Sequence, residues 1–506
     1  MTVARASGSG VAAGTGVAAT GRLSVTNSAV EPFDPISLYA AGVEAGLECA
    51  LWLRPSEDFA LVGIGRAWAV EPAGPERFGE AAAAFRGLVS VAGAANVAGV
   101  AAAAGVAGAT GSGAGDARRH GALRGIGPVL MGGLGFSGRV PAADGEWSPF
   151  RAASLILPSL TALRSGDGSW LTTATVSAAA PDASGAMGRS GGADGSVAWP
   201  RLAARASELA ASASDLATSA AESGADVPLA IDAQTPDREH WRHAVGLIAG
   251  AVGRGRLDKV VLARRLGLTA TAPLDVPSAL RRLAVTSAES SVFAFHRGAT
   301  TFMGATPERL ARTDGRAYRT VAIAGSTRRG ATPAEDDALA AELMTSDKER
   351  EEHAVVVRTI RRQLEPISER LEVAARPSVL RLRHVQHLVT EFTGSVRGDD
   401  GLLGLAGLLH PTPAVGGEPR DLALAMVDEH EDFERGWYAG PIGWLSPNGD
   451  GELMVALRCG LVRGSGAALF AGCGIVADSD PDREWDESTI KLRTLAAALG
   501  QLEGER

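Results

Sequence analysis

Two acidic segments in the second half of the chain have the spacing of side chains that share a helix face. Glu349 and Glu352 lie three positions apart in DKEREEH, and Glu484, Glu487 and Lys491 recur at intervals of three and four in DREWDESTIK. Residues at these intervals lie on one face of a helix. Carboxylates from two separate helices suit a hard divalent cation such as Mg²⁺, which binds oxygen and keeps water or substrate oxygens as its other ligands. Taken alone, each segment could equally be a solvated face with ordinary ion pairs.

A lysine and a glutamate elsewhere could carry acid–base chemistry. Lys259 begins the apolar run KVVLARR. Burial disfavours the charged form of a lysine and makes it a usable base, whereas an exposed lysine would only extend its charge into water. Glu308 follows a proline in ATPERL. A buried carboxyl there could be a general acid, and an exposed one would merely cap a turn.

Two glycine-containing segments could approach a bound anion closely. Gly472 and Gly474 lie in AGCGIV, and residues 410–419 read HPTPAVGGEP. Glycine lets the backbone come near a ligand, and proline makes the other end of such a loop rigid. Both features are also common in purely structural strands and loops. The sequence contains neither the phosphate loop GxxxxGK[ST] nor the zinc motif HExxH.

The composition limits the class of protein. The chain has 506 residues, of which 45% are hydrophobic, so it can bury a large core in one large mixed fold or several domains. Its net charge of −9 does not favour nucleic-acid binding, which normally needs a basic face. Cys49, Cys459 and Cys473 form no paired motif and are interpreted as buried thiols of a cytoplasmic protein. We expect neither a signal peptide nor a membrane span, because the N-terminus and the Ala/Gly-rich run lack large apolar side chains.

The composition also changes along the chain. Residues 1–30 are rich in small residues and are expected to be a disordered lead-in. Residues 31–235 are expected to form the N-terminal part of the fold, with low-complexity insertions near residues 91–120 and 177–198. Residues 236–506 are dense in apolar patterns and are expected to form the catalytic region.

Helices and strands must position these side chains, and the periodicity predicts both in mixed order. Helices are predicted in HWRHAVGLIAGAVG, in SDKEREEHAVVVRTIRRQLEPISERLE and in STIKLRTLAAALGQLE. Strands are predicted in FALVGIGRAWAV, SLILPSLTAL, KVVLARRL, SVFAFHRG, TTFMGATPERLART, GELMVALRCGLVRG and ALFAGCGIVADS. No regular βαβ alternation is present. The pattern therefore favours an α+β fold, with large antiparallel β-sheets flanked by helices, over a doubly wound parallel sheet.

Taken in order, several of these segments resemble one enzyme family. They are KVVLARR, MGATPERL, AGSTRRG, SDKEREEH, HLVTEFTG, HPTPAVGG, YAGPIGW, ALRCGLV and AGCGIVADSDPDREWDESTIKL. The sequence is similar to the chorismate-utilising enzymes, which include isochorismate, salicylate, anthranilate and aminodeoxychorismate synthases. The match is dense over residues 240–500 and weaker upstream. The resemblance implies the anthranilate synthase component I-like fold, Mg²⁺ as cofactor and chorismate as substrate.

The resemblance also implies a role for each matching residue. Lys259 matches the lysine that activates water for attack at C2 of chorismate, and Glu308 matches the acid that protonates the departing C4 hydroxyl. The magnesium ligands are matched by Glu352 and Glu487, with Glu349 and Glu484 as second or water-mediated partners. The substrate pocket is matched by Gly325, Ser326, His387, Ala414, Tyr438, Arg458, Gly472 and Lys491.

Three positions separate members of the family. Relatives that use ammonia resemble this sequence with glutamine in place of Lys259. Aminodeoxychorismate synthases have a nucleophilic lysine where this chain has Ala324, and salicylate synthases have threonine where it has Ala414. The resemblance therefore implies an isochorismate synthase that feeds menaquinone or siderophore synthesis and acts as a monomer. A salicylate synthase, which goes on to eliminate pyruvate, and a non-catalytic homologue that acts as an interaction protein remain alternatives.

Overall fold

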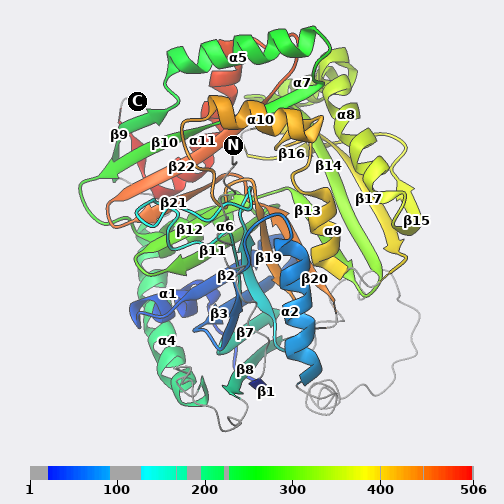
Figure 1. Ribbon diagram of the computed structural model, residues 1–506. Helices are drawn as coiled ribbons and strands as arrows, with labels where there is room; N and C mark the ends of the chain where they lie inside the picture. Colours follow the sequence, from blue (N-terminus) through cyan, green and yellow to red (C-terminus); the bar gives the residue numbers. More distant parts are fainter. Residues whose placement is uncertain are drawn as a thin grey trace, which may run out of the picture.

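Two β-sheets, flanked by helices, form the body of the protein (Figure 1). The computed structural model describes residues 21–91, 127–166, 168–178, 195–220, 227–383, 385–398, 401–447 and 449–503. Every pairing among the described strands is antiparallel except that of β9 with β23. The predicted α+β class with large antiparallel sheets is therefore confirmed.

The first sheet has 13 strands in the order β1-β8-β7-β3-β2-β11-β12-β21-β22-β10-β9-β23, with β18 paired to β10. Its strands are β1 Gly21–Ala29, β2 Cys49–Arg54, β3 Phe59–Ile64, β7 Leu160–Ser165, β8 Gly168–Ala178, β9 Pro228–Thr235, β10 Lys259–Ala270, β11 Ser291–Arg297, β12 Thr300–Thr306, β18 Gly417–Glu418, β21 Cys459–Arg463, β22 Gly466–Ile475 and β23 Gln501–Leu502.

The second sheet has 10 strands in the order β15-β17-β14-β13-β20-β19-β5-β6-β4, with β16 paired to β17. Its strands are β4 Trp68–Val70, β5 Leu130–Leu134, β6 Ala153–Leu157, β13 Arg309–Asp314, β14 Ala317–Arg328, β15 Ser368–Val373, β16 Ser378–Arg381, β17 Val385–Val396, β19 Pro441–Leu445 and β20 Gly451–Val455.

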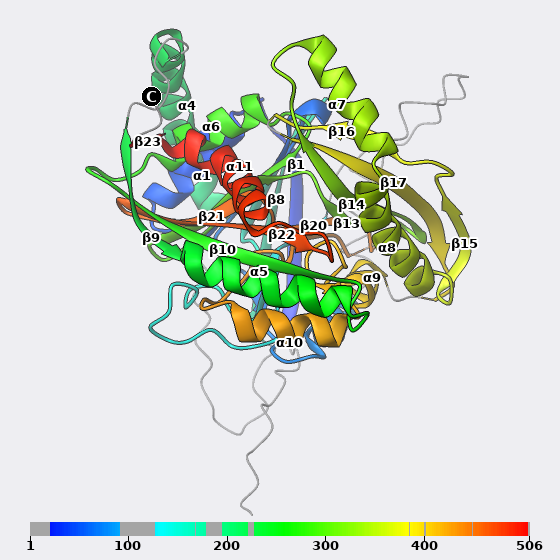
Figure 2. The ribbon, with the colours of Figure 1, turned by 90° about the horizontal axis from the view of Figure 1, so that it is seen from above.

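The helices cover the outer surfaces of the sheets. Helix α8 packs against β14, and α11 packs against β22 with α5 beside it (Figure 2). The helices are α1 Pro35–Glu44, α2 Arg77–Val91, α4 Gly195–Ala220, α5 Arg238–Gly253, α6 Val276–Thr286, α7 Pro333–Thr345, α8 Asp347–Leu364, α9 Gly401–Leu409, α10 Arg420–His430 and α11 Pro481–Leu499, with a 3-10 turn at Pro55–Glu57. Among the described residues, no helix is long and apolar enough to cross a membrane.

Short connections carry the chain from one sheet to the other. Strand β12 of the first sheet is followed by β13 of the second after only Pro307 and Glu308. The chain returns between β20 and β21 through residues 456–458. The upstream half crosses in the same way, between β3 and β4 and between β6 and β7. Residues before and after position 235 therefore share both sheets.

Aromatic side chains fill much of the core between the sheets. Trp147 and Phe150 come from the segment before β6 and pack edge-on against Phe302 and Trp437. The ring centroids of Trp147 and Phe302 are 5.2 Å apart, as are those of Phe150 and Trp437. Edge-to-face packing of buried rings adds to the stabilisation from removing their surface from water. A second apolar cluster lies where α1, α4, α6 and α11 meet the first sheet.

The structure corrects several element boundaries predicted from the sequence. The segment FALVGIGRAWAV forms two strands, β3 and β4, in different sheets, and SLILPSLTAL likewise divides into β6 and β7. TTFMGATPERLART and GELMVALRCGLVRG each divide between the sheets in the same way. The long acidic helix ends at Leu364, and residues 368–373 form β15 instead.

The expectation of disorder over residues 1–30 is wrong for Gly21–Ala29. These residues form β1, which pairs along its whole length with β8 and buries Leu23. Residues 1–20 lie outside the described part of the chain, as do residues 92–126 and 179–194, which contain most of the two predicted insertions. Residues 177 and 178, which were predicted to belong to the second insertion, are part of β8.

Candidate active site

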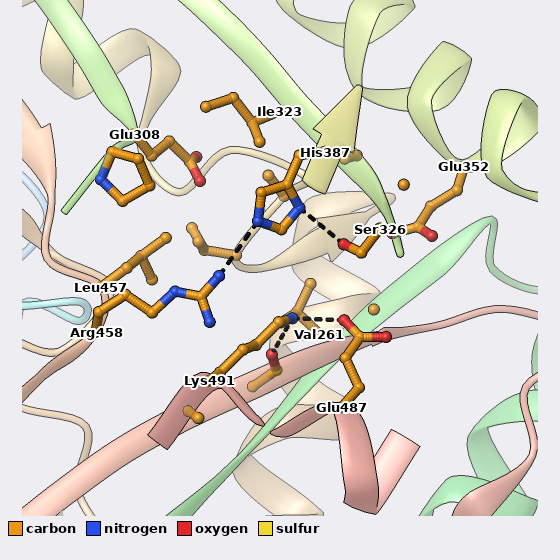
Figure 3. Close-up of a pocket in the computed structure, with 18 of the residues that line it drawn as sticks. Val261, Glu308, Ile323, Ser326, Glu352, His387, Leu457, Arg458, Glu487 and Lys491 are labelled. Carbon is orange, nitrogen blue, oxygen red and sulfur yellow. Dashed lines mark hydrogen bonds and ion pairs between the residues drawn. The ribbon is translucent and has the colours of Figure 1, made fainter. Parts of the chain in front are cut away.

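The crossings near residues 308 and 458 bring two functional side chains to one place between the sheets. The backbone N–H of Val455 donates to the Glu308 carbonyl at 2.9 Å, and that of Ala305 donates to the Arg458 carbonyl at 3.3 Å. Arg458 has a backbone φ of +50°. A non-glycine residue in this left-handed region is strained and persists only when its surroundings hold it there. The turn thus directs the Arg458 side chain into the cavity described next (Figure 3).

A cavity that is partly open to solvent lies at this junction, with about 700 Å³ of empty space when the solvent at its mouth is included. Strands of both sheets and helices α8 and α11 line it. All of the residues predicted to be catalytic, to bind substrate or to ligate metal directly lie on its wall. They are Lys259, Glu308, Gly325, Ser326, Glu352, His387, Ala414, Tyr438, Arg458, Gly472, Glu487 and Lys491. Segments far apart in the sequence therefore converge on one site, as the resemblance implies.

Glu308 has the properties of a general acid. Its side chain points into the cavity beside His387 and Arg458 (Figure 3). Burial raises the pKa of Glu308 from 4.5 to about 7, although the positive charges of Lys259, Lys491 and Arg458 oppose this shift. A carboxyl with a pKa near neutrality can hold a proton at the pH of the cell and release it in a reaction.

Lys259 is the first residue of β10 and is only 2% exposed. Its Nζ donates to Oε1 of Glu352 at 2.7 Å. The neighbouring strand β22 leaves space for the lysine because residue 474 is glycine. A Cβ at position 474 would lie 2.7 Å from Lys259 Nζ and 2.8 Å from Glu352 Oε1. Of the two interpretations of this glycine, the geometry supports the structural one, because a side chain at position 474 would displace the lysine.

Four carboxylates gather at the edge of the cavity. Glu349 and Glu352 come from α8, and Glu484 and Glu487 from α11. Burial, together with the nearby charges of Glu352 and Glu487, raises the pKa of Glu349. Burial and the charge of Glu487 raise the pKa of Glu484 to about 7. Glu349 and Glu484 do not line the cavity itself. Their role as second or water-mediated partners of a metal ion stays a prediction.

The ligand chemistry of this cluster fits a hard divalent cation. Carboxylates that raise one another's pKa gain from a positive charge placed among them. A sulfur atom is also nearby, because ligand atoms of Cys473, Glu484 and Glu487 lie within 4.8 Å of one another. Burial raises the pKa of the Cys473 thiol well above its usual value, and its Sγ donates to the Glu484 carbonyl at 3.1 Å. The carboxylate oxygens that the two helices contribute are the ligand type that a hard divalent cation prefers.

A chain of hydrogen bonds fixes the protonation of His387. Arg458 Nη2 lies 3.2 Å from His387 Nε2, and His387 Nδ1 lies 2.8 Å from Ser326 Oγ (Figure 3). Burial and the charge of Arg458 lower the pKa of His387 well below 6.5, so the ring is neutral. Because a guanidinium can only donate, Nε2 accepts and Nδ1 carries the proton. Nδ1 then donates to Ser326, whose hydroxyl proton is free to point at an anionic ligand.

Lys491 provides a second positive charge. Its Nζ donates to the Gly472 carbonyl at 2.9 Å and to Glu487 Oε1 at 2.7 Å (Figure 3). Burial disfavours the charged form of Lys491, but the charge of Glu487 more than offsets this and raises its pKa. Lys491 and Arg458 in turn lower the pKa of Glu487 despite its burial. The ion pair of Glu487 and Lys491 is thus a component of the cavity wall, and the alternative of a solvated helix face does not hold for it.

The sequence reasoning missed the apolar part of the wall. Val261, Ile323, Leu457 and Phe470 line the cavity and could contact a carbon ring. Strand alternation could have found two of them, because Val261 lies two residues after Lys259 and Phe470 two before Gly472, on the same strand faces. Tyr438 stacks on Phe470, with ring centroids 5.4 Å apart.

Fold and site together define an α+β protein in which one cavity combines an acid, a lysine, cationic groups and a carboxylate cluster. The profile of the chorismate binding enzymes matches residues 114–500. The chain belongs to that family.

The chain is similar to known proteins both in sequence and in structure, as one relative and two proteins of solved structure illustrate. The "Salicylate biosynthesis isochorismate synthase" of Pseudomonas aeruginosa is 33% identical over 94% of this chain and 90% of its own length. The structure of MenF, the menaquinone-specific isochorismate synthase of Escherichia coli, aligns with a TM-score of 0.69 and 26% identity over 95% of both chains. Anthranilate synthase component I of Streptococcus pneumoniae aligns with a TM-score of 0.59 at 20% identity, over 87% of this chain and 92% of that chain, and shows the shared fold alone.

Proposed function

We propose that the protein is an isochorismate synthase, which moves the hydroxyl group of chorismate from C4 to C2 with the help of Mg²⁺. The observation that carries the proposal is the presence of a buried lysine and a carboxyl with a pKa of about 7 on the wall of one cavity. The names of the relatives support the same reaction.

The reaction needs one proton removed and one proton supplied. In its neutral amine form, Lys259 accepts a proton from water, and the water oxygen forms a bond to C2 of chorismate. The ring double bonds shift, the C4–oxygen bond breaks, and Glu308 gives its proton to the departing hydroxide to form water. General base and general acid assistance each contribute typically about 10²–10⁴-fold to a rate.

Substrate binding depends on the cationic and hydroxyl groups of the cavity. Arg458 can hold a carboxylate through two parallel hydrogen bonds, and Ser326 can donate its free hydroxyl proton. Lys491 adds a charge beside Gly472. Glu352 and Glu487 would hold the magnesium ion, with Glu349 and Glu484 behind them. When bound, the ion supplies positive charge that neutralises a substrate carboxylate and orients the ring.

Two alanines of the cavity wall support a reaction that ends once water has been added to chorismate. Ala324 lines the cavity and cannot form a covalent adduct, unlike the lysine of aminodeoxychorismate synthases. Ala414 also lines it, at the position where salicylate synthases have threonine. We further propose a cytoplasmic monomer whose product feeds either menaquinone or siderophore synthesis.

Product analysis tests the proposal. Purified protein is incubated with chorismate and Mg²⁺, and the products are separated by liquid chromatography. Isochorismate is expected as the product. Salicylate and pyruvate in equal amounts would favour the salicylate synthase alternative, and no consumption of chorismate would favour a non-catalytic homologue.

A Lys259→Ala variant tests the assignment of the base. It is expected to lose turnover by about 10²–10⁴-fold while still binding chorismate, because the groups that hold the carboxylates remain. Full activity of this variant would contradict the mechanism.

A further inference from the structure

A buried ion pair lies directly behind the cavity wall. Arg435 donates from Nε to Glu431 Oε2 at 2.7 Å and from Nη2 to Glu431 Oε1 at 2.5 Å. The two side chains are 4% and 3% exposed. Neither lines the catalytic cavity, and the mechanism above uses neither. A fully buried ion pair is weak evidence for stability, since burying the charges opposes their attraction. Its contacts therefore point to another role.

The pair binds the edge of the strand that carries Lys259. One edge of β10 pairs continuously with β22. On the other edge, β18 pairs with residues 259 and 260, and β9 pairs from Arg265 onward. Residues 261–264 have no described strand on that edge. There, Ala263 N–H donates to Glu431 Oε1 at 2.6 Å, and Arg435 Nη2 donates to the Val261 carbonyl at 2.7 Å.

The same arginine holds the loop that carries Ala414. Arg435 Nη1 donates to the Val415 carbonyl at 2.9 Å. Val261 and Val415 both line the catalytic cavity. The arginine also lies over the Phe136 ring, with 4.2 Å between its Cζ and the ring centroid. The Phe136 ring against one face and the hydrogen bonds within the plane fix the orientation of the guanidinium.

We propose that the Glu431–Arg435 pair is a positioning device, which replaces a missing strand segment at the edge of β10 and sets the distance between the base-bearing strand and the Ala414 loop. This role rests on the proposed function. A guanidinium and a carboxylate can do this because together they offer several donors and acceptors in fixed planes. A lysine at position 435 could not serve both carbonyls and the carboxylate in that geometry.

Two variants test the role. Arg435→Met removes the donors but leaves Glu431 buried without its partner, which could impair folding. The double variant Glu431→Met/Arg435→Met removes both charges and also the acceptor of the Ala263 N–H. The matched control is Arg54→Met, because Arg54 pairs with the equally buried Glu452 in a part of the sheets that does not line the cavity.

The first measurement is amide hydrogen exchange of the peptide that covers residues 259–266. We expect faster exchange in the double variant and no change in Arg54→Met. Unchanged exchange would overturn the proposal, whether or not the wild-type protein converts chorismate. Absence of wild-type turnover would instead contradict the proposed function.

The second measurement is kcat and KM per folded molecule, with the folded fraction taken from circular dichroism. Displacing a catalytic group by about 1 Å can cost on the order of 10²-fold in rate. A loss of that size in kcat, with KM changed much less, is expected for the double variant. A pair with only a structural role would lower the melting temperature, as Arg54→Met should, and leave kcat per folded molecule unchanged. That result would also overturn the proposal.

Discussion

The space left by Gly474 allows a small perturbation of the proposed base and of its partner Glu352. In Gly474→Ala, the added methyl group would lie 2.7 Å from Lys259 Nζ and closer still to its Cε. An ordinary contact between such atoms is about 3.5–4.0 Å. The lysine amine must therefore move by about 1 Å, and its ion pair with Glu352 must break or rearrange. Because the obstructing atoms are the end of a flexible side chain, the fold can accept the methyl group while the base cannot keep its place.

We expect Gly474→Ala to lower kcat on the order of 10²-fold, the effect of misplacing a reacting group by about 1 Å. The assay is magnesium-dependent formation of isochorismate, with the melting temperature as a check on folding. Gly466→Ala is the matched control, because residue 466 lies on the same strand and its nearest neighbours to an added Cβ are at 3.6 and 3.9 Å. Activity of Gly474→Ala within about threefold of the wild type would refute the placement of Lys259 as the base.

The remaining predictions concern pH and metal. Burial raises the pKa of Glu308 to about 7, so between pH 4.5 and 7 the unfolded chain releases a proton that the folded protein keeps, and stability falls as pH rises. Glu308→Gln should therefore gain stability relative to the wild type by up to roughly 3 kcal/mol at about pH 8 and much less at about pH 4. Urea denaturation at the two pH values measures this, and an equal difference at both would contradict it. Mg²⁺ should raise the melting temperature of the wild type by relieving repulsion among the four carboxylates, and Glu487→Gln should abolish that shift. Chelation by EDTA should remove turnover, and excess Mg²⁺ should restore it. Full turnover in EDTA would contradict the metal site.

Much of the site could be predicted from local sequence pattern. The helical spacing of Glu349 with Glu352 and of Glu484 with Glu487 is seen in α8 and α11. The strand that begins at Lys259 follows its amphipathic helix as expected. Each of these features depends on the periodicity of side chains within one helix or strand. A short stretch of neighbouring residues is enough to show it.

The crossings between sheets could not be predicted in the same way. The local pattern of TTFMGATPERLART does not indicate that its first half pairs with β11 and its second half with β20, in different sheets. Strand β1 was missed for a related reason, since its composition resembles a flexible lead-in and only its pairing with β8 makes it a strand. In both examples, the structure of a segment depends on pairing with strands that are far away in the sequence.

The crossings between the two sheets also determine whether the catalytic region can fold without the upstream chain. Although residues 236–506 contain every proposed catalytic and ligating residue, β2 lies against β11 and β5 lies against β19. Removing the upstream chain would expose the backbone of both β11 and β19 as apolar, unpaired strand edges. Such edges recruit other chains. A fragment that begins at residue 236 is therefore expected to aggregate, so the upstream segment is an internal partner that keeps the catalytic half soluble.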